Sequence, residues 1–307
     1  MKIHYGFEEV GHIRNAVVTT GSFDGVHLGH QVILKKLIQL AAEENGESVL
    51  ITFYPHPRLV LYPDSSGKDL LMINTRKEKI LLLEKAGLDH VIFVKFTREF
   101  SETSSVEFVK EYLINKLHTR KIVTGENHHF GKNRTGDIEE LRQLGALNNF
   151  DLELIPHQDI QNVDISSTLI RESIIRGKIE KANTYLTHPY YIIGYLKEGS
   201  QSIRKQGYTT YTIEIEEKNK LLPPCGSYLV DVMENKIIKK GIALISKCSN
   251  SLSDSILDIY INGKITHFNK EIVLLFTREI NVLDDDKKGS LLNSIMMKDL
   301  TRFANNE

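Results

Sequence analysis

Two histidines stand three residues apart in GSFDGVHLGH, residues 21–30, a segment that also holds three glycines and an aspartate. An apolar, β-branched run, AVVTT, comes directly before it, and a run with helical spacing, QVILKKLIQLAAEE, comes directly after it. This pattern predicts a tight strand-to-helix turn, in which glycines let the backbone approach a ligand closely. The N–H groups and the dipole at the start of a helix favour an anion. Because two imidazoles there can donate hydrogen bonds to phosphoryl oxygens, the segment points to a phosphate-binding turn.

Other chemistries fit this turn less well. It lacks the Gly-Lys-Ser/Thr that closes a Walker P-loop, and no third ligand with recognisable spacing accompanies His27 and His30 to bind zinc. His128 and His129 are adjacent, so on an extended segment their side chains point to opposite faces and make poor co-ligands. We therefore expect no metal ion held by protein ligands. On spacing alone, a glycine-rich connection with merely exposed histidines stays an alternative.

The elements that must position the turn alternate between strand and helix patterns over about the first 185 residues. Strand patterns fall at 16–20, 48–53, 90–96, 121–125 and 151–155. Helical patterns fall from about 29 to 44, at 75–87 after a Thr cap, and at 106–117 after the capping-box pair Ser104 and Glu107. This alternation predicts an α/β fold with a Rossmann-like, doubly wound, mostly parallel sheet. Ligands of such sheets bind beyond the carboxyl ends of the strands.

The pattern changes after about residue 186. Short β-branched or aromatic runs at 208–216, 226–232, 255–261 and 271–276 are separated by Gly, Pro, Asn and Ser clusters. They predict an antiparallel β-barrel, and the segment 284–303 predicts a C-terminal helix after it. We therefore expect two domains, residues 1–186 and residues 187–307.

Composition limits the partners. The 39 basic and 40 acidic residues give a net charge of −1, so no overall field favours nucleic acid or an anionic membrane. The N-terminal segment has no apolar core of a signal sequence, and no run approaches the length that spans a bilayer. Only Cys225 and Cys248 are present, which suits a reducing cytoplasm. We expect small-molecule partners, and the sequence leaves the oligomeric state open.

Four segments, in order, resemble the motifs of the bacterial FAD synthetases, the prokaryotic riboflavin kinase/FMN adenylyltransferases. GSFDGVHLGH fits the family's G-x-F-D-G-x-H-x-G-H without a departure, and TFYPHP at 52–57 is similar to T-F-x-P-H-P. GENHHFGKNRTGD at 125–137 looks like G-x-[DN]-F-x-F-G-x-x-R-x-G-D, with His128 where Phe is usual. ISSTLIRESIIRGKIEKANTYL at 165–186 resembles I-S-S-T-x-I-R and the helix that follows it.

This resemblance implies transfer of AMP from ATP, bound with Mg²⁺, to FMN, which gives FAD and pyrophosphate. His27 and His30 would contact the α- and β-phosphates, and Arg171 the leaving pyrophosphate. The residues implied to bind ATP are Gly21, Ser22, Phe23, Gly29, Ser167 and Thr168. The residues implied to bind FMN are Thr52, Phe53, His56, Pro57, Arg58 and Asn127. The alternatives are a plain helix cap at Ser167 and Thr168, a solvated Arg171 and a rigid, ligand-free YPHP turn.

The resemblance also implies that the barrel is a riboflavin kinase domain, but several of its characteristic residues differ here. Thr209, Tyr211 and Thr212 stand where the family has Pro, Ala and an Asn that serves Mg·ATP. Ser253 stands where the family has its glutamate base, and serine cannot accept the substrate proton as a carboxylate does. We therefore expect a barrel that is inactive as a kinase, although a one-residue shift that brings Asp254 into place would restore the base.

Three alternatives to a pure FMN adenylyltransferase stay open at this point. The first is the bifunctional enzyme, which converts riboflavin through FMN to FAD. The second is a non-catalytic flavin or nucleotide sensor, for which His128 and the altered barrel leave room. The third is a nucleotidyltransferase with another phosphorylated acceptor, such as a pantetheine or nicotinamide phosphate, which the TFYPHP segment and the barrel disfavour.

Overall fold

The structure is a computed structural model of the chain. It describes residues 1–65, 67, 70–126, 128–156, 159–160, 163–197, 203–205, 208–234, 237–247, 255–262, 265 and 271–282. By their contacts the residues form two compact units, 1–70 with 79–165, and 71–78 with 166–307. This grouping assigns residues 166–186 to the second unit, whereas the sequence motifs place them in the first domain; the domain boundary at 186/187 stays a prediction.

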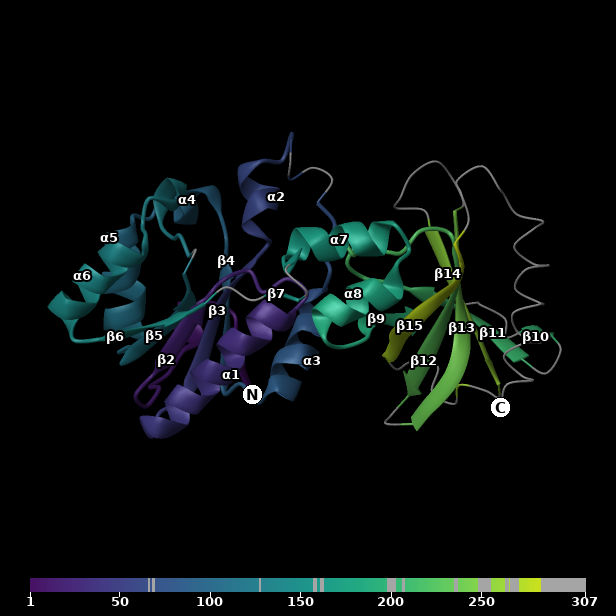
Figure 1. Cartoon of the computed structure of the whole chain (residues 1–307), viewed down its shortest axis with the longest axis horizontal. Helices are drawn as coiled ribbons and strands as arrows, with labels where there is room; N and C mark the ends of the chain where they lie inside the picture. The colour runs from purple at the N-terminus through teal and green to yellow at the C-terminus, as the bar shows by residue number, and fades with distance from the viewer. Residues whose placement is uncertain are drawn as a thin grey trace. The chain divides into compact units, whose positions relative to one another are not determined.

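A six-stranded parallel sheet forms the frame of the first unit, in the order β1-β4-β3-β2-β5-β6 (Figure 1). Its strands are β1 (Lys2–His4), β2 (Val17–Thr20), β3 (Ser48–Tyr54), β4 (His90–Lys95), β5 (Lys121–Gly125) and β6 (Asp151–Ile155). From β2 the chain builds outward through β3 and β4, then returns to the other side of β2 as β5. The order therefore reverses between β2 and β5, and sheets of this kind bind ligands at that point. The predicted Rossmann-like sheet is confirmed, with β1 as an edge strand that was not predicted.

Helices cover both faces of this sheet. Helix α1 (Leu28–Glu43) packs on β2, β3 and β5. The π-helix η2 (Phe108–Lys116) and helix α6 (Ile138–Asn148) share a hydrophobic core with the alternate strand residues. Those strand residues are Val18, Val49, Ile51, Ile92, Val94 and Ile122. Since side chains of a strand alternate between faces, the buried residues between them point to the other face, as a doubly wound sheet requires.

Further helices and strands complete the described part of the chain before residue 166. They are η1 (Phe7–Glu9), α2 (Pro57–Leu61), α3 (Arg76–Ala86), α4 (Arg98–Ser101), α5 (Ser105–Glu107), η3 (Lys132–Arg134), β7 (Asp159–Ile160) and β8 (Val163–Asp164). Two predicted helix starts are confirmed. The Glu78 N–H donates to Thr75 Oγ1 at 3.2 Å while the Thr75 N–H donates to Glu78 Oε2 at 2.9 Å. The Glu107 N–H donates to Ser104 Oγ at 3.1 Å, although the helix after it continues as the π-helix η2.

The second unit contains a closed antiparallel barrel, as predicted. The strand order is β10-β11-β14-β13-β12-β15-β9, and a further pairing of β11 with β9 closes the ring. Its strands are β9 (Tyr190–Leu196), β10 (Ile203–Lys205), β11 (Tyr208–Glu214), β12 (Gly226–Glu234), β13 (Ile237–Lys247), β14 (Ser255–Asn262) and β15 (Ile272–Val282). Helices α7 (Ser167–Ile175) and α8 (Ile179–Leu186) precede it in the chain. The C-terminal helix predicted at 284–303 lies outside the described residues.

A buried ion pair fixes the start of α3 within this unit. Lys220 Nζ donates to Glu78 Oε2 at 2.6 Å and to the carbonyl oxygens of Ile73 and Tyr191 at 2.6 and 2.7 Å. Glu78 Oε1 accepts from the Ile193 N–H at 2.9 Å, and both charged side chains are at most 1% exposed. Burial raises the pKa of Glu78, and the neighbouring Lys220 opposes that rise. The pair is tolerated in the core because its charged atoms are hydrogen-bonded.

Lys220→Met would leave the Glu78 carboxylate buried without its cation. We expect the free energy of unfolding of the second unit to fall by about 3–5 kcal/mol, measured by urea denaturation with circular dichroism. The double variant Lys220→Met/Glu78→Gln carries no buried charge and should recover part of this loss. The matched control is Lys240→Met, whose ion pair with Asp231 is largely exposed on the lysine side and should contribute no more than about 1 kcal/mol. Equal stability of Lys220→Met and Lys240→Met would contradict this interpretation.

Candidate active site

The histidine turn joins the end of β2 to the start of α1. Its backbone is left-handed at three positions, Phe23 (φ 45°), Gly25 (φ 93°) and Val26 (φ 42°). Only glycine adopts such angles readily, so the turn is a tight reversal that an ordinary sequence avoids. The reversal brings His27 to the N-cap position of α1 and His30 into the first turn of that helix.

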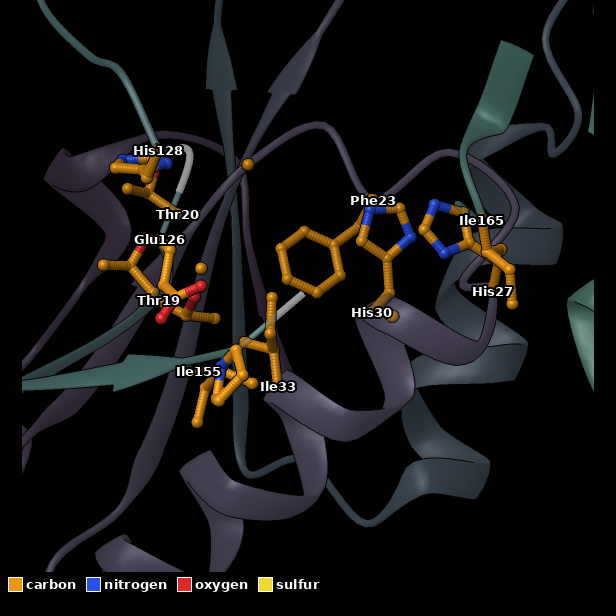
Figure 2. A pocket seen from close by; sticks show the side chains of 15 residues that line it. Thr19, Thr20, Phe23, His27, His30, Ile33, Glu126, His128, Ile155 and Ile165 are labelled. Carbon is orange, nitrogen blue, oxygen red and sulfur yellow. The ribbon is translucent and has the colours of Figure 1, made fainter. Parts of the chain in front are cut away.

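Three rings stack along this turn (Figure 2). The centroids of His27 and His30 lie 3.7 Å apart with 23° between the planes, and those of Phe23 and His30 lie 4.5 Å apart with 24° between the planes. His30 Nδ1 is buried and has no hydrogen-bond partner among the residues that the structure describes. Burial lowers the pKa of His30 well below its usual 6.5, and the nearby charges of His27 and Lys79 lower it further. At neutral pH His30 is therefore a neutral imidazole whose buried nitrogen can take up a partner.

A cavity of about 270 Å³ lies against these rings. Its walls come from the end of β2, from the start of α1, and from the residues that end or follow β5 and β6. The lining residues are Thr19, Thr20, Gly21, Phe23, His27, Gly29, His30, Ile33, Thr124, Gly125, Glu126, His128, Ile155, Pro156 and Ile165. In Figure 2, Thr19, Glu126 and His128 lie on one side of the Phe23 ring and the two histidines on the other. The cavity thus lies at the carboxyl ends of β2 and β5, where the strand order reverses.

Two side chains from other elements hold the Ser22 carbonyl of the turn. Lys79, from α3, donates to this oxygen at 2.6 Å, and the Thr52 hydroxyl, from β3, donates to it at 3.2 Å. Both side chains are buried, with Lys79 at 5% and Thr52 at 0% exposure. Sequence reasoning missed Lys79, because the contact joins positions 57 residues apart and no motif marks it.

His128 forms part of the cavity wall opposite the histidine pair. Burial lowers its pKa to about 4, with smaller contributions from His129 and Arg134. Its ring stacks on Phe130 with 5.8 Å between centroids and 13° between planes. A neutral imidazole thus occupies the position at which the resemblance leads us to expect phenylalanine, while the predicted FMN ligand Asn127 lies outside the described residues.

The other residues predicted to bind FMN gather at the end of β3 and in α2. Phe53 packs edge-on against Phe96 at 5.6 Å and against the core. His56 is the N-cap of α2, where its Nδ1 accepts from the Arg58 N–H at 3.2 Å, and Pro57 is the first residue of that helix. The Arg58 side chain is exposed. These residues are near one another because they are close in the sequence, and their role in binding FMN stays a prediction.

The remaining predicted residues lie on α7, in the second unit. The N-cap of α7 is Ser166, whose Oγ accepts from the Leu169 N–H at 3.3 Å. Ser167 and Thr168 are therefore the first two residues of the helix and not its cap. Arg171 Nε donates to the Leu71 carbonyl at 2.8 Å, so this guanidinium is partly engaged by the segment before α3.

The described residues contain neither a metal-binding cluster nor a membrane-spanning helix. No group of three or more His, Cys, Asp or Glu side chains in this part of the chain is arranged to share a metal ion. Of the described helices, none combines the length and the apolar character needed to cross a membrane.

Residues 10–169 match the family model of FAD synthetase. The chain belongs to the FAD synthetase family. The motif resemblance stated above is thus confirmed, and the histidine turn, the cavity and the β3 end all fall within the matched residues.

Curated members of the FAD synthetase family are similar over most of the chain. A bifunctional riboflavin kinase/FMN adenylyltransferase of Listeria monocytogenes is 33% identical over 84% of this chain and 80% of its own length. An FAD synthetase of the same organism is 34% identical over 75% of this chain and 89% of its own length. A bifunctional relative from Buchnera aphidicola of Acyrthosiphon pisum is 32% identical over 91% of this chain and 90% of its own length.

The chain also resembles a solved structure. A crystal structure described as a macrolide-efflux protein from Streptococcus pneumoniae has a TM-score of 0.82 and covers 98% of this chain and 97% of that chain. Because the two sequences are only 22% identical, this likeness is informative about the fold alone.

The lowered pKa of His30 makes stability depend on pH. In the unfolded chain this imidazole binds a proton near pH 6.5, whereas in the folded protein it does so only at a lower pH. Stability is therefore full above about pH 6.5 and falls as the pH is lowered, by up to about 1.4 kcal/mol per pH unit. His30→Gln removes this titration, so we expect a shallower pH dependence of its urea unfolding between about pH 8 and pH 5. Parallel curves for the two proteins would contradict the assigned direction.

Proposed function

We propose that this member of the FAD synthetase family transfers AMP from ATP to FMN, giving FAD and pyrophosphate, and that His27 and His30 bind the transferring phosphate. The observation that carries the proposal is the stacked histidine pair at the N-cap and in the first turn of α1, lining the cavity where the strand order reverses. The curated relatives that cover most of the chain are named for FMN adenylyl transfer or for FAD synthesis.

The reaction requires an FMN phosphate oxygen to attack the α-phosphorus of ATP in line while pyrophosphate leaves. Charge on the transferring group and on the leaving group must be stabilised, and two anions must be held in contact. His27 and His30 donate to the α- and β-phosphate oxygens, and the N-terminal N–H groups of α1 add positive potential at the same place. Burial lowers the pKa of His30 in the site without nucleotide, so this imidazole is neutral there. When the nucleotide binds, the negative phosphates raise the pKa of His30 and favour its protonation.

The remaining ATP contacts that we propose follow the family motifs. Gly21, Ser22, Phe23 and Gly29 belong to the histidine turn, and three of these four residues line the cavity. Ser167 and Thr168 supply hydroxyls from the first turn of α7, and Arg171 binds the leaving pyrophosphate through its planar fork. Mg²⁺ enters with ATP, because this ion prefers phosphate oxygens and waters to protein ligands, and it draws charge from the phosphates.

We propose that FMN binds along the end of β3 and α2. Phe53, His56 and Pro57 shape this side, Arg58 meets the FMN phosphate, and Asn127 contacts a phosphate or the flavin. The Thr52 hydroxyl donates to the Ser22 carbonyl, so we assign Thr52 to the wall of the site through that contact.

The barrel, by this proposal, no longer phosphorylates riboflavin. Thr212 replaces the Asn that serves Mg·ATP, and its hydroxyl donates to Asp258 Oδ1 at 2.6 Å across the β11–β14 pair. Burial raises the pKa of Asp258, which this hydrogen bond counteracts. The positions of Ser253 and Asp254 lie outside the described residues. The second candidate is the bifunctional enzyme, because relatives that match up to 91% of the chain carry that name.

The partners that we propose are the small molecules ATP and FMN, with riboflavin only if the barrel is active, and neither nucleic acid nor a membrane. The compartment that we propose is the cytoplasm, where ATP and flavin are available to a thiol-containing chain.

His30→Ala tests the proposed role of the imidazole. Losing one donor to the charge that develops in the transition state should lower kcat by about 100- to 1,000-fold, measured as FAD formed from ATP and FMN with Mg²⁺. His12→Ala removes an exposed histidine of the same unit and is the matched control, with unchanged kcat. A His30→Ala enzyme as fast as the control would rule out this role.

A paired assay with FMN or riboflavin as the flavin substrate separates the two candidate functions. We expect FAD from FMN and ATP, and no FMN from riboflavin and ATP, as resolved by chromatography. ATP-dependent formation of FMN would show that the barrel is an active kinase. If calorimetry shows that flavin binds but the assay shows that no FAD is formed, the protein is instead a non-catalytic sensor.

A further inference from the structure

The Ser22 carbonyl is one of the points at which the histidine turn is attached to the rest of the first unit, beside the Gly21 N–H, which donates to the Ile51 carbonyl at 3.0 Å. It accepts hydrogen bonds from Lys79 Nζ at 2.6 Å and from Thr52 Oγ1 at 3.2 Å. Lys79 comes from α3 and is only 5% exposed, so the chain places an ammonium group in the interior beside its phosphate-binding turn. Hydrogen bonds from a charged donor are among the strongest in proteins.

The turn needs such an attachment because its conformation is unfavourable in isolation. Directly after Ser22, the backbone is left-handed at Phe23, Gly25 and Val26. Val26 is β-branched, a residue type that rarely adopts this conformation. Helix α1 fixes the far end of the turn at His27. At the near end, the Gly21 N–H pairs with β3 through the Ile51 carbonyl, and side chains hold the turn itself through the Ser22 carbonyl. A released carbonyl would let Phe23 shift, and the Phe23 ring is the one on which His30 stacks.

The ammonium also acts on His30 through its charge. The groups that influence the His30 proton are His27 at the cap of α1 and Lys79 from α3, both of which lower the pKa of His30 in addition to burial. Glu126 and His128 line the same cavity from the residues after β5. Lys79 therefore helps keep the free imidazole neutral, and it adds positive potential close to the position proposed for the triphosphate.

We propose that Lys79 is a positioning residue for adenylyl transfer, which holds the histidine turn through the Ser22 carbonyl and contributes a buried positive charge beside the phosphate site. This inference rests on the proposed function. It predicts consequences that a lysine needed only for folding would not have, since both the placement of His30 and its protonation depend on Lys79.

Lys79→Met, in the full-length chain, removes the charge and the donor while keeping a similar shape. We expect kcat to fall by about 10- to 100-fold, the scale for misplaced reacting groups, with KM for ATP and for FMN changed less than about threefold. The alkaline limb of the kcat–pH profile, where His30 loses the proton that it shares with the phosphates, should move to higher pH, because His30 loses the charge that lowers its pKa. Lys79→Arg, which keeps a charged donor, should recover most of kcat. The matched control is Lys85→Met, an exposed lysine of the same helix, with unchanged kcat and pH profile.

Thr52→Val separates the hydrogen bonding of the Ser22 carbonyl from the effect of the buried positive charge. It also provides a test if Lys79→Met does not fold. It removes the second donor to the Ser22 carbonyl and keeps the ammonium, so we expect a smaller fall in kcat with an unmoved alkaline limb. Two results would overturn the inference. One is a Lys79→Met enzyme with the kcat and pH profile of the control. The other is a fall in kcat matched by a fall in thermal stability, with the pH profile unchanged.

A titration that needs no catalysis keeps this inference separate from the proposed function. Histidine ¹⁵N NMR of the free protein should show the His30 imidazole titrating at a higher pH in Lys79→Met than in the unsubstituted chain. An inactive chain that shows this shift would refute the proposed function and retain the link between Lys79 and His30. An active enzyme without the shift would refute that link alone.

Discussion

Two imidazole rings with centroids 3.7 Å apart in a buried site cannot both become positively charged unless a negative charge accompanies them. Burial and the neighbouring charges of His27 and Lys79 lower the pKa of His30, so a bound anion would favour a protonated form that the free site disfavours. The other features of the site position this pair or add to its positive potential. A left-handed turn brings the rings together, the start of α1 adds its dipole, and the reversal of strand order opens a cavity beside them.

This constraint explains how a chain with a net charge of −1 can handle two anionic nucleotides. We propose that attraction comes from a few donors held in a partly water-excluded site, where each interaction is stronger than in bulk water. The imidazoles, the N–H groups of α1 and the Lys79 ammonium meet at one turn, although they come from separate parts of the sequence. In the second unit, the buried Lys220–Glu78 pair is compensated differently, by hydrogen bonds between the two side chains and to backbone groups.

Sequence patterns predicted the features that depend on local chemistry. The glycines and histidines of the turn, the Thr75 cap and the alternating strands are short-range signals, and the structure confirms each of them. Features that depend on long-range contacts were missed. Strand β1 has only three residues, and Lys79 looks like an ordinary helix lysine until folding brings Ser22 to it. The same reason hid the Glu78–Lys220 pair, whose members are 142 positions apart.

The most direct test concerns the claim that this site positions two substrates and forms no bond of its own with the adenylyl group. Histidine can act as a nucleophile, so two imidazoles beside the α-phosphate make a covalent intermediate chemically conceivable. The measurement is the configuration at phosphorus in FAD formed from FMN and a single diastereomer of ATP that carries sulfur on the α-phosphate. A single in-line displacement, as in this account, gives inversion at phosphorus. Retention would reveal two displacements through an adenylyl-enzyme and would contradict it.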